Sequence, residues 1–347
     1  MLLLLGSVAC KKEKEVPAEL GLVYTTVSTL AGNGTSGFAD GSAATARFRD
    51  PAGVTADAQG NVFVADIGNS SIRKITPGGV VSTLAGNGTN GFVNGALATA
   101  RFHGPADVAF DAQGNLYVAD FGNHCLRKIT PGGTVTTFAG TGVAGFADGG
   151  ASTAQFNGPD RLIIDGQGVI YVSDYDNNRI RKVMPNGTVS TLAGTGQPGF
   201  ADGPGQSAQF SGPVGLALDA QGTLYVAEFW GQRVRKIAPS GMVSTLAGSG
   251  VPGYADGTGS TAQFYGATGL AIDAHGDLLV ADVGNYCIRK ITPGGVVSTV
   301  AGTRTPGFAD GPVGTAQFEG ASGIAAGTKG ILYVTESGER IRKITAE

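Results

Sequence analysis

Short apolar runs alternate with polar turns along almost the whole chain, and the same series of runs returns every 54 residues. In one copy, alternating residues 213–219 lead into the turn Asp219-Ala-Gln-Gly, followed by the β-branched and aromatic run 223–228 and by runs at 233–237 and 242–247. Runs of this length between glycine-containing turns are typical of β-strands. No helical 3.6-residue periodicity competes with them. Each copy therefore predicts four short strands.

The register of the repeat is kept through six copies. It is marked by an arginine at Arg73, Arg127, Arg181, Arg235, Arg289 and Arg342, and by an aromatic residue at Phe48, Phe102, Phe156, Phe210, Phe264 and Phe318. Four antiparallel strands per unit, repeated four to eight times, indicate a β-propeller. Its turns also account for the high glycine content, 59 residues.

The two ends of the chain complete each other. One outer-strand sequence, residues 27–32, precedes any complete unit, and the last unit stops after its third strand at Ile344. Pairing these two ends would remove the exposed edges of an open sheet. The sequence therefore predicts an all-β, six-bladed propeller of four-stranded antiparallel blades over residues 23–347, with the N-terminal strand completing the last blade.

The charge balance bears on the class of partner. The chain has 24 Lys and Arg against 27 Asp and Glu, a net charge of −3. Nucleic-acid binding needs clustered basic residues in excess, so we exclude this class of partner. No composition break divides residues 23–347, and we expect a single domain and a monomer.

The first residues, MLLLLGSVAC, resemble the end of a bacterial lipoprotein signal peptide. This resemblance implies a signal segment at residues 1–9, lipidation of Cys10, a tether at 10–22 and a place in the bacterial cell envelope. The apolar run is too short to span a bilayer, so contact with the membrane would be through the lipid alone. A processed secretory signal with an incidental cysteine, and hence a secreted protein, stays open.

Two further cysteines lie in equivalent places of different units. Cys125 and Cys287 are separated by three periods and fall in the second and fifth blades, which face each other across the ring. Their Cα atoms cannot approach within the ~7 Å that a disulfide requires. We expect two buried free thiols.

The pattern Gly-Pro-x-Gly-Leu-Ala-x-Asp, Gly-x-Leu-Tyr-Val-Ala-Asp and Asn-x-x-Ile-Arg-Lys-Ile resembles the NHL repeat, most clearly over residues 104–129 and 266–291. The added segments Gly-Phe-Ala-Asp-Gly and Ala-x-Phe look like those of bacterial envelope proteins with NHL repeats. The resemblance implies a propeller. It does not select a function, because the family includes protein- and RNA-binding modules and metal-dependent lyases.

An acid closes the second strand of every unit and precedes the repeated arginine by six or seven residues. The pairs are Asp66 and Arg73, Asp120 and Arg127, Asp174 and Arg181, Glu228 and Arg235, Asp282 and Arg289, and Glu336 and Arg342. A ring of carboxylates for a cation is one interpretation. Because both members recur in every unit, we favour structural ion pairs, which buried carboxylates require.

The Gly-Phe-Ala-Asp-Gly segment connects one unit to the next. We expect its aromatic residue to pack beneath the loop and its aspartate, such as Asp40, to cap its own turn. One aspartate per segment is too few for calcium. The three histidines, His103, His124 and His275, fall on opposite faces and cannot converge on a zinc ion.

Departures from the repeat are where a specific site should lie. After the second strand, units two to four carry Phe121, Tyr175, Phe229 and the only tryptophan, Trp230. Before the first strand, the usual Pro-x-Gly becomes Pro-Ala-Asp107 and Pro-Asp160-Arg161. Aromatic residues with a few polar groups at a propeller mouth suit ligand binding. Ordinary drift among repeats is the alternative.

These observations favour a non-catalytic, envelope-tethered scaffold that binds a protein, peptide or glycan through the aromatic sector. We expect no cofactor and no catalytic residue. Two alternatives stay open. One is a lyase or lactonase with a metal held by Asp107 and Asp160, for which a third ligand and a base are lacking. The other is a structural spacer.

Overall fold

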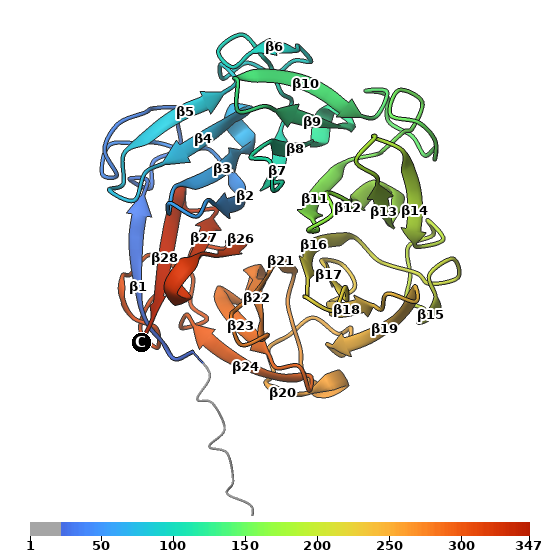
Figure 1. Cartoon of the computed structure of the whole chain (residues 1–347). Coiled ribbons are helices and arrows are strands. Elements are labelled where there is room, and N and C mark those ends of the chain that lie inside the picture. Colours follow the sequence, from blue (N-terminus) through green and yellow to red (C-terminus); the bar gives the residue numbers. More distant parts are fainter. Residues whose placement is uncertain (1–21) are drawn as a thin grey trace, which may run out of the picture.

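The computed structural model of the chain describes residues 22–347, which form six antiparallel β-sheets arranged as blades around a central axis (Figure 1). The innermost strands are β2 (Pro51–Ala56), β7 (Pro105–Phe110), β11 (Pro159–Ile164), β16 (Pro213–Leu218), β21 (Ala267–Ile272) and β26 (Ala321–Ala326). The second strands are β3 (Val62–Asp66), β8 (Leu116–Asp120), β12 (Ile170–Asp174), β17 (Leu224–Glu228), β22 (Leu278–Asp282) and β27 (Leu332–Glu336).

The outer half of each blade holds the repeated arginine. The third strands are β4 (Ser71–Ile75), β9 (Cys125–Ile129), β13 (Arg179–Val183), β18 (Arg233–Ile237), β23 (Cys287–Ile291) and β28 (Arg340–Ala346). The fourth strands are β5 (Val81–Ala85), β10 (Thr134–Ala139), β14 (Val189–Ala193), β19 (Met242–Ala247) and β24 (Val296–Ala301), with β1 (Tyr24–Ala31) in the sixth blade.

The predicted closure of the ring is confirmed. Strand β1 pairs antiparallel with β28, with Val27 opposite Ile344 and Thr29 opposite Arg342. The chain thus brings its first described strand against its last, and the two lie side by side in Figure 1. This pairing supplies the fourth strand that the last repeat lacks.

A fifth, two-residue edge strand is the one addition to the predicted blade. It appears as β6 (Gly95–Ala96), β15 (Gly203–Pro204), β20 (Gly257–Thr258) and β25 (Gly311–Pro312), while the first and third blades have a single bridge at Gly41 and Gly149. Each connecting segment runs along the outside of the fourth strand of the blade it is about to enter. The segment therefore covers an edge that would otherwise be open.

Short 3₁₀ turns complete the secondary structure. Five of them follow second strands or edge strands, and the last precedes β27: η1 (Ile67–Asn69), η2 (Phe121–Asn123), η3 (Tyr175–Asn177), η4 (Gly259–Thr261), η5 (Val283–Asn285) and η6 (Thr328–Gly330). None of the helices within residues 22–347 has the length and apolar character needed to cross a bilayer.

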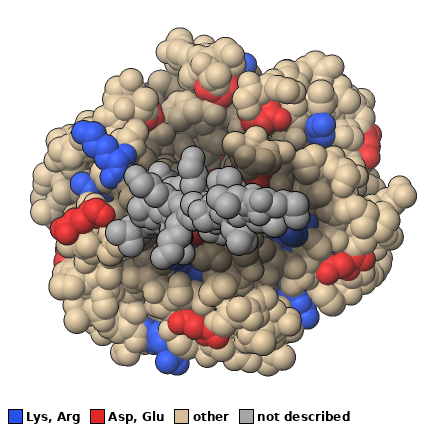
Figure 2. All heavy atoms as spheres, turned by 60° about the horizontal axis from the view of Figure 1, so that its bottom comes forward, with Lys and Arg blue, Asp and Glu red and all other residues tan. Residues whose placement is uncertain are grey.

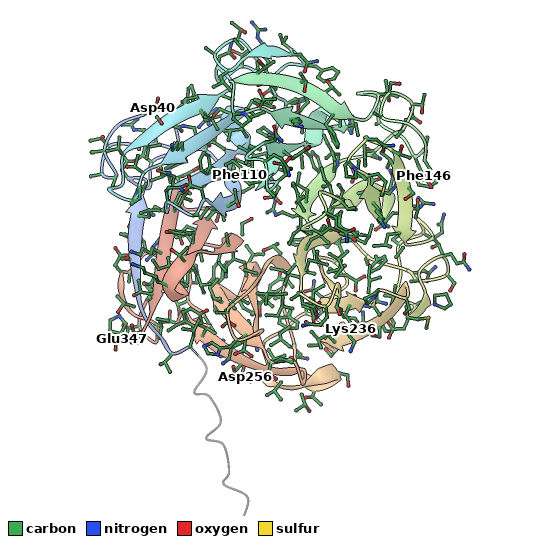
Figure 3. The ribbon with its side chains drawn as sticks, viewed as in Figure 1. Asp40, Phe110, Phe146, Lys236, Asp256 and Glu347 are labelled. Carbon is green, nitrogen blue, oxygen red and sulfur yellow. The ribbon has the colours of Figure 1, made fainter. Side chains whose placement is uncertain are left out.

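The hydrophobic core lies between neighbouring blades. One cluster, for example, joins Phe63 and Ile72 of the first blade to Phe102 and Val118 of the second. Phe110 on the innermost strand lies nearer the axis than Asp40, Phe146 and Asp256 on the outer part of the ring (Figure 3). Because blades cover one another on both faces, second strands such as β3 and β8 are buried along their whole length.

Cys125 and Cys287 are buried free thiols, as predicted. Figure 2 shows acidic and basic side chains interspersed over the visible elements, with no large patch of one sign. The predicted signal segment at residues 1–9, Cys10 and all but the last residue of the tether at 10–22 lie outside the described residues.

Candidate functional site

Each blade holds one buried arginine between two acidic or amide groups and against two aromatic rings. In the first blade, Arg73 Nη1 donates to Asp66 Oδ2 and Arg73 Nη2 donates to Asp40 Oδ1, both at 2.7 Å. The rings of Phe38 and Phe48 lie 5.0 and 5.1 Å from Arg73 Cζ. We call this set of five side chains the arginine clasp.

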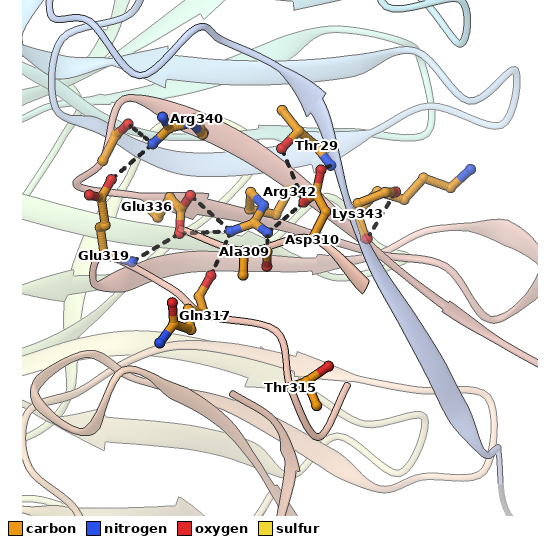
Figure 4. A network of polar contacts seen from close by, with 12 residues as sticks. Thr29, Ala309, Asp310, Thr315, Gln317, Glu319, Glu336, Arg340, Arg342 and Lys343 are labelled. Carbon is orange, nitrogen blue, oxygen red and sulfur yellow. Dashed lines mark hydrogen bonds and ion pairs between the residues drawn. The ribbon is translucent and has the colours of Figure 1, made fainter. Parts of the chain in front are cut away.

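The clasp recurs in every blade. The ion pairs between second and third strands measure 2.8 Å for Asp120 and Arg127, 2.6 Å for Asp174 and Arg181, 3.2 Å for Glu228 and Arg235, 2.9 Å for Asp282 and Arg289, and 3.1 Å for Glu336 and Arg342. Figure 4 shows Arg342 between Glu336 and Asp310. All six arginines and their second-strand acids are buried. Carboxylates that are already paired and inaccessible leave no ring of acids for a cation.

The expected role of the segment aspartates was wrong. Asp40 does not cap its own turn, because its Oδ2 accepts from the backbone N–H of Thr83 at 3.0 Å and its Oδ1 accepts from Arg73. Burial alone would raise the pKa of Asp40, but the hydrogen bonds from Thr83 and Arg73 lower it. Phe38, expected beneath the loop, is 43% exposed and covers the arginine instead.

One position on the innermost strands is glycine in four blades and charged in two. The six residues are Gly53, Asp107, Arg161, Gly215, Gly269 and Gly323. A Cβ on Gly215 would collide with the carbonyl oxygen of Thr268, and one on Gly269 would lie 2.6 Å from that of Ser322. Adjacent innermost strands are too close there for a side chain. Blades two and three break this rule with Asp107 and Arg161.

Arg161 crosses the central channel. Its Nη1 donates to the carbonyl of Ala106 at 2.8 Å, and its Nη2 lies 3.5 Å from Ser322 Oγ on β26, in the opposite blade. Nη1 also lies 3.0 Å from Asp160 Oδ1, without the geometry of a hydrogen bond. The side chain lines cavities on both sides of this level. Arg161 therefore divides the channel into a lower chamber and an upper mouth.

The lower chamber has a volume of about 260 Å³. Asp107 lies at its upper end, where Asp107 Oδ2 accepts from the backbone N–H of Leu162 at 3.0 Å. Burial raises the pKa of Asp107 to about 6, although Arg161 and the hydrogen bond from Leu162 oppose the rise. An aliphatic ring below it consists of Val54, Val108, Leu162, Leu216, Leu270 and Ile324.

The upper mouth has a volume of about 360 Å³ and gathers four of the seven predicted ligand residues. Asp160, Arg161, Tyr175 and Phe229 all line it. The remaining walls are mainly small or aliphatic residues, among them Ile67, Val214, Thr268, Val283, Ser322 and Ser337. Both aromatic rings, Asp160 and Arg161 therefore come from blades three and four, and Asp50 of the first blade is the one other charged residue among residues 22–347 that lines this cavity.

Trp230 forms the rim of the upper mouth without lining it. Its ring is 63% exposed and packs edge-on against Phe229, with centroids 4.7 Å apart. Its Nε1 donates to the hydroxyl of Tyr175 at 2.8 Å. Three aromatic side chains from two neighbouring blades thus form one continuous surface, which leads from solvent into the mouth.

Phe121, by contrast, does not line the upper mouth. A Cβ placed on Gly158 would lie 2.9 Å from the ring of Phe121, so this ring covers the backbone between blades two and three. Asp107 also lies apart, on the other side of Arg161. The structure therefore separates these two residues from the other five.

The histidines do not meet. His124 Nδ1 accepts from the backbone N–H of Gly158 at 3.2 Å, and His103 and His275 belong to other loops. Among residues 22–347 no three His, Cys, Asp or Glu side chains are grouped in a way that could hold a metal ion. Asp107 and Asp160, the weak metal candidates, flank the guanidinium of Arg161, so a cation placed between them would meet a positive charge.

Sequence reasoning missed several lining residues. Asp50 and Ser322 both line the upper mouth, the first beside the channel entrance and the second as a neighbour of Arg161. Ser322 falls at the same place in the repeat as Asp160, and Ile67 and Val283 share the place of Tyr175. Aligning the six copies column by column would have pointed to Ser322, Ile67 and Val283, but not to Asp50, which lies in neither column.

Residues 48–75, 102–129 and 264–291 match the NHL repeat family. The chain is 32% identical over 282 residues to Protein SUPPRESSOR OF QUENCHING 1 of Arabidopsis thaliana, which spans 76% of this chain and 27% of that protein. It is 29% identical over 290 residues to NHL repeat-containing protein 2 of Homo sapiens, spanning 72% and 40%. The chain thus spans less than half of either relative.

Solved structures share the fold at lower identity. An auxiliary nutrient binding protein from Bacteroides thetaiotaomicron superposes with a TM-score of 0.72 and 15% identity, over 93% of this chain and 76% of that one. A streptogramin B lyase gives a TM-score of 0.57 and 14% identity, over 93% and 98%. Identities this low concern the fold alone. The matched repeats and the closed six-bladed ring together show that the chain is an NHL-repeat β-propeller.

Proposed function

We propose that this propeller is a binding module that takes its ligand in the upper mouth, against Tyr175, Phe229 and the rim residue Trp230. The observation that supports the proposal most is the convergence of Asp160, Arg161, Tyr175 and Phe229 on one cavity of about 360 Å³. A concave site with apolar walls and a few polar groups is the usual form of a ligand pocket. A protein named as nutrient binding shares the fold, which agrees with the proposal.

Thermal stability in the presence of candidate ligands tests this proposal. Panels of peptides, glycans and small metabolites should include a ligand that raises the Tm of the wild type, since binding to the folded state stabilises it. Tyr175→Ala and Phe229→Ala should lose that rise. Tyr265→Ala is the matched control, because Tyr265 is an exposed aromatic residue outside the mouth. Equal responses of all variants would overturn the proposed site.

A metal-dependent lyase or lactonase is the second candidate. It rests on the two carboxylates in the channel, Asp107 and Asp160, and on a lyase with the same fold, and the guanidinium of Arg161 beside both acids counts against it. Elemental analysis of the purified chain, with and without chelator, tests it. One ion held per chain and lost in Asp107→Asn would favour the enzyme, and absence of metal would contradict it.

Envelope tethering through Cys10 belongs to the same proposal. It rests on the sequence MLLLLGSVAC, which resembles a lipoprotein signal. Metabolic labelling with an alkyne fatty acid should mark the wild type and not Cys10→Ala. Release of an unlabelled, shortened wild-type chain into the medium would instead support a secreted protein.

A further inference from the structure

We propose that the upper mouth recognises an organic ammonium group, such as a lysine side chain or a choline-like headgroup. This inference rests on the proposed function and specifies the chemistry of its ligand. It follows from three features of the mouth, namely its charge, a carboxylate that has one ion pair and an oxygen without a hydrogen bond, and the aromatic rings that line the same cavity.

The charges at the mouth do not balance. Two acids, Asp50 and Asp160, line it together with one base, Arg161, and Asp107 lies directly beneath. The positive charge of Arg161 is already paired, because Arg161 Nη1 lies 3.0 Å from Asp160 Oδ1. The same nitrogen donates to the carbonyl of Ala106 at 2.8 Å. An additional anion would add to the repulsion among these acids, whereas a cation would relieve it.

The carboxylate of Asp160 has few bonding partners within residues 22–347 of the protein. The Asp160 side chain is only 20% exposed, and its Oδ1 makes one ion pair, with Arg161 Nη1 at 3.0 Å, and accepts no hydrogen bond from any residue in the described part of the chain. Burial raises the pKa of Asp160 even though Arg161 lies beside it. A buried carboxylate with a single ion pair and no hydrogen bond at that oxygen keeps capacity for a second cationic partner. A lysine ammonium would donate an N–H to it, whereas choline, which has no N–H, would meet it through its charge alone.

Aromatic rings line the same cavity as the carboxylate of Asp160. Tyr175 and Phe229 line the same cavity as Asp160, and Trp230 continues their surface outward. Ring faces attract cations, and ammonium groups held among aromatic side chains are a recurring form of recognition. The facing walls of Ile67 and Val283 would pack against an alkyl chain that carries the charge. Acid, rings and apolar wall match one end of a lysine side chain better than a neutral sugar or an anion.

The single tryptophan makes the inference measurable in the intact chain. Trp230 is the only tryptophan among 347 residues, so intrinsic fluorescence reports on the rim of the mouth alone. Choline chloride is titrated against sodium chloride at equal ionic strength. In a second arm, N-acetyl-lysine methylamide is compared with the same molecule acetylated on Nε, which keeps the backbone and the alkyl chain, loses the charge and gains an acetyl group. The first arm tests a free headgroup and the second a side chain of a peptide.

We expect choline or N-acetyl-lysine methylamide to change the Trp230 emission in a saturable way. The Nε-acetylated molecule should change it far less. Asp160→Asn should weaken binding about tenfold or more, since it removes a charged partner at direct contact. Asp176→Asn is the matched control. Asp176 is an exposed acid of η3, next to Tyr175 in the same blade as Asp160, and does not line the mouth. A purely long-range attraction would make binding as sensitive to its loss as to that of Asp160.

Three outcomes would overturn the inference: no response to either cation, an equal response to the Nε-acetylated molecule, or unchanged affinity of a correctly folded Asp160→Asn variant. Circular dichroism and the Tm of that variant show whether it is folded. A ligand that needs Tyr175 and not Asp160 would refute ammonium recognition and leave the binding module intact. If binding depended on neither Tyr175 nor Asp160, the proposed binding site itself would be refuted.

Discussion

The arginine clasps and the upper mouth are built from the same repeat but obey different rules. Every clasp has a buried arginine, a buried second-strand acid (aspartate or glutamate) and two aromatic rings, and Asn94 in place of aspartate in the second blade is its one change of charge. The mouth consists of equivalent positions too, yet nearly every blade contributes a different side chain. Symmetry therefore marks what six blades need in order to fold, and loss of symmetry marks where one ligand can be recognised.

The largest predicted effect is the loss of stability when the arginine of a clasp is removed. Arg181→Ala and Arg289→Ala should each reduce the free energy of unfolding by about 3–5 kcal/mol, because each leaves a buried carboxylate without its counterion. The two losses should be similar, since the clasps are equivalent, and they should add, since the sites are far apart. Urea denaturation of the single and double variants measures both.

Asp148→Asn is the matched control for the clasp. It keeps an oxygen for Arg181 and copies the natural Asn94 of the second blade, so we expect a loss of no more than about 1 kcal/mol. A loss as large as that of Arg181→Ala would mean that the exposed acid, and not the buried one, holds the clasp together.

Asp107 in the channel should make the free energy of unfolding depend on pH between its unfolded and folded pKa values. Its pKa is raised from 3.8 to about 6 by burial, so between these values the folded chain holds a proton that the unfolded chain releases. The stability attributable to Asp107 is therefore present at low pH and is lost as the pH rises towards 6, by about 3 kcal/mol in total. Subtracting the stability curve of Asp107→Asn from that of the wild type isolates this change. A difference that does not vary across this window would show that Arg161 keeps Asp107 ionised throughout.

Four blades have glycine at the innermost-strand position that Asp107 and Arg161 fill in the other two. We expect these four blades not to tolerate a side chain there. Gly215→Ala should cost about 1–3 kcal/mol or more, because its Cβ would meet the backbone carbonyl of Thr268, which cannot rotate away. Gly314→Ala is the control, since nothing lies within 4 Å of the added carbon. Equal denaturation midpoints for both variants would mean that neighbouring innermost strands separate easily, and the channel would be wider in solution.

Prediction from the sequence was most successful where the repeat is strict. The strands, the number of blades, the closure and the acid–arginine partners could all be found because each recurs with a fixed spacing. The fifth edge strand and the second acid of the clasp could not, since nothing in Gly-Phe-Ala-Asp-Gly shows that the segment returns along the blade it enters. Phe121 and Tyr175 share one repeat position, and only packing shows that Tyr175 lines the mouth while Phe121 covers Gly158.

The smallest predicted effect concerns the rim. Tyr175→Phe removes the oxygen that accepts from Trp230 Nε1 at 2.8 Å, and keeps the ring. Because this hydrogen bond is exposed, water can replace the hydroxyl, and the free energy of unfolding should fall by no more than about 0.5–1 kcal/mol. Trp230 emission should nevertheless shift as its indole exchanges one partner for another. If stability fell as much as in a clasp variant, the rim would belong to the framework of the fold. An unchanged stability with a changed emission would instead place Trp230 where a ligand can replace its partner without disturbing the propeller.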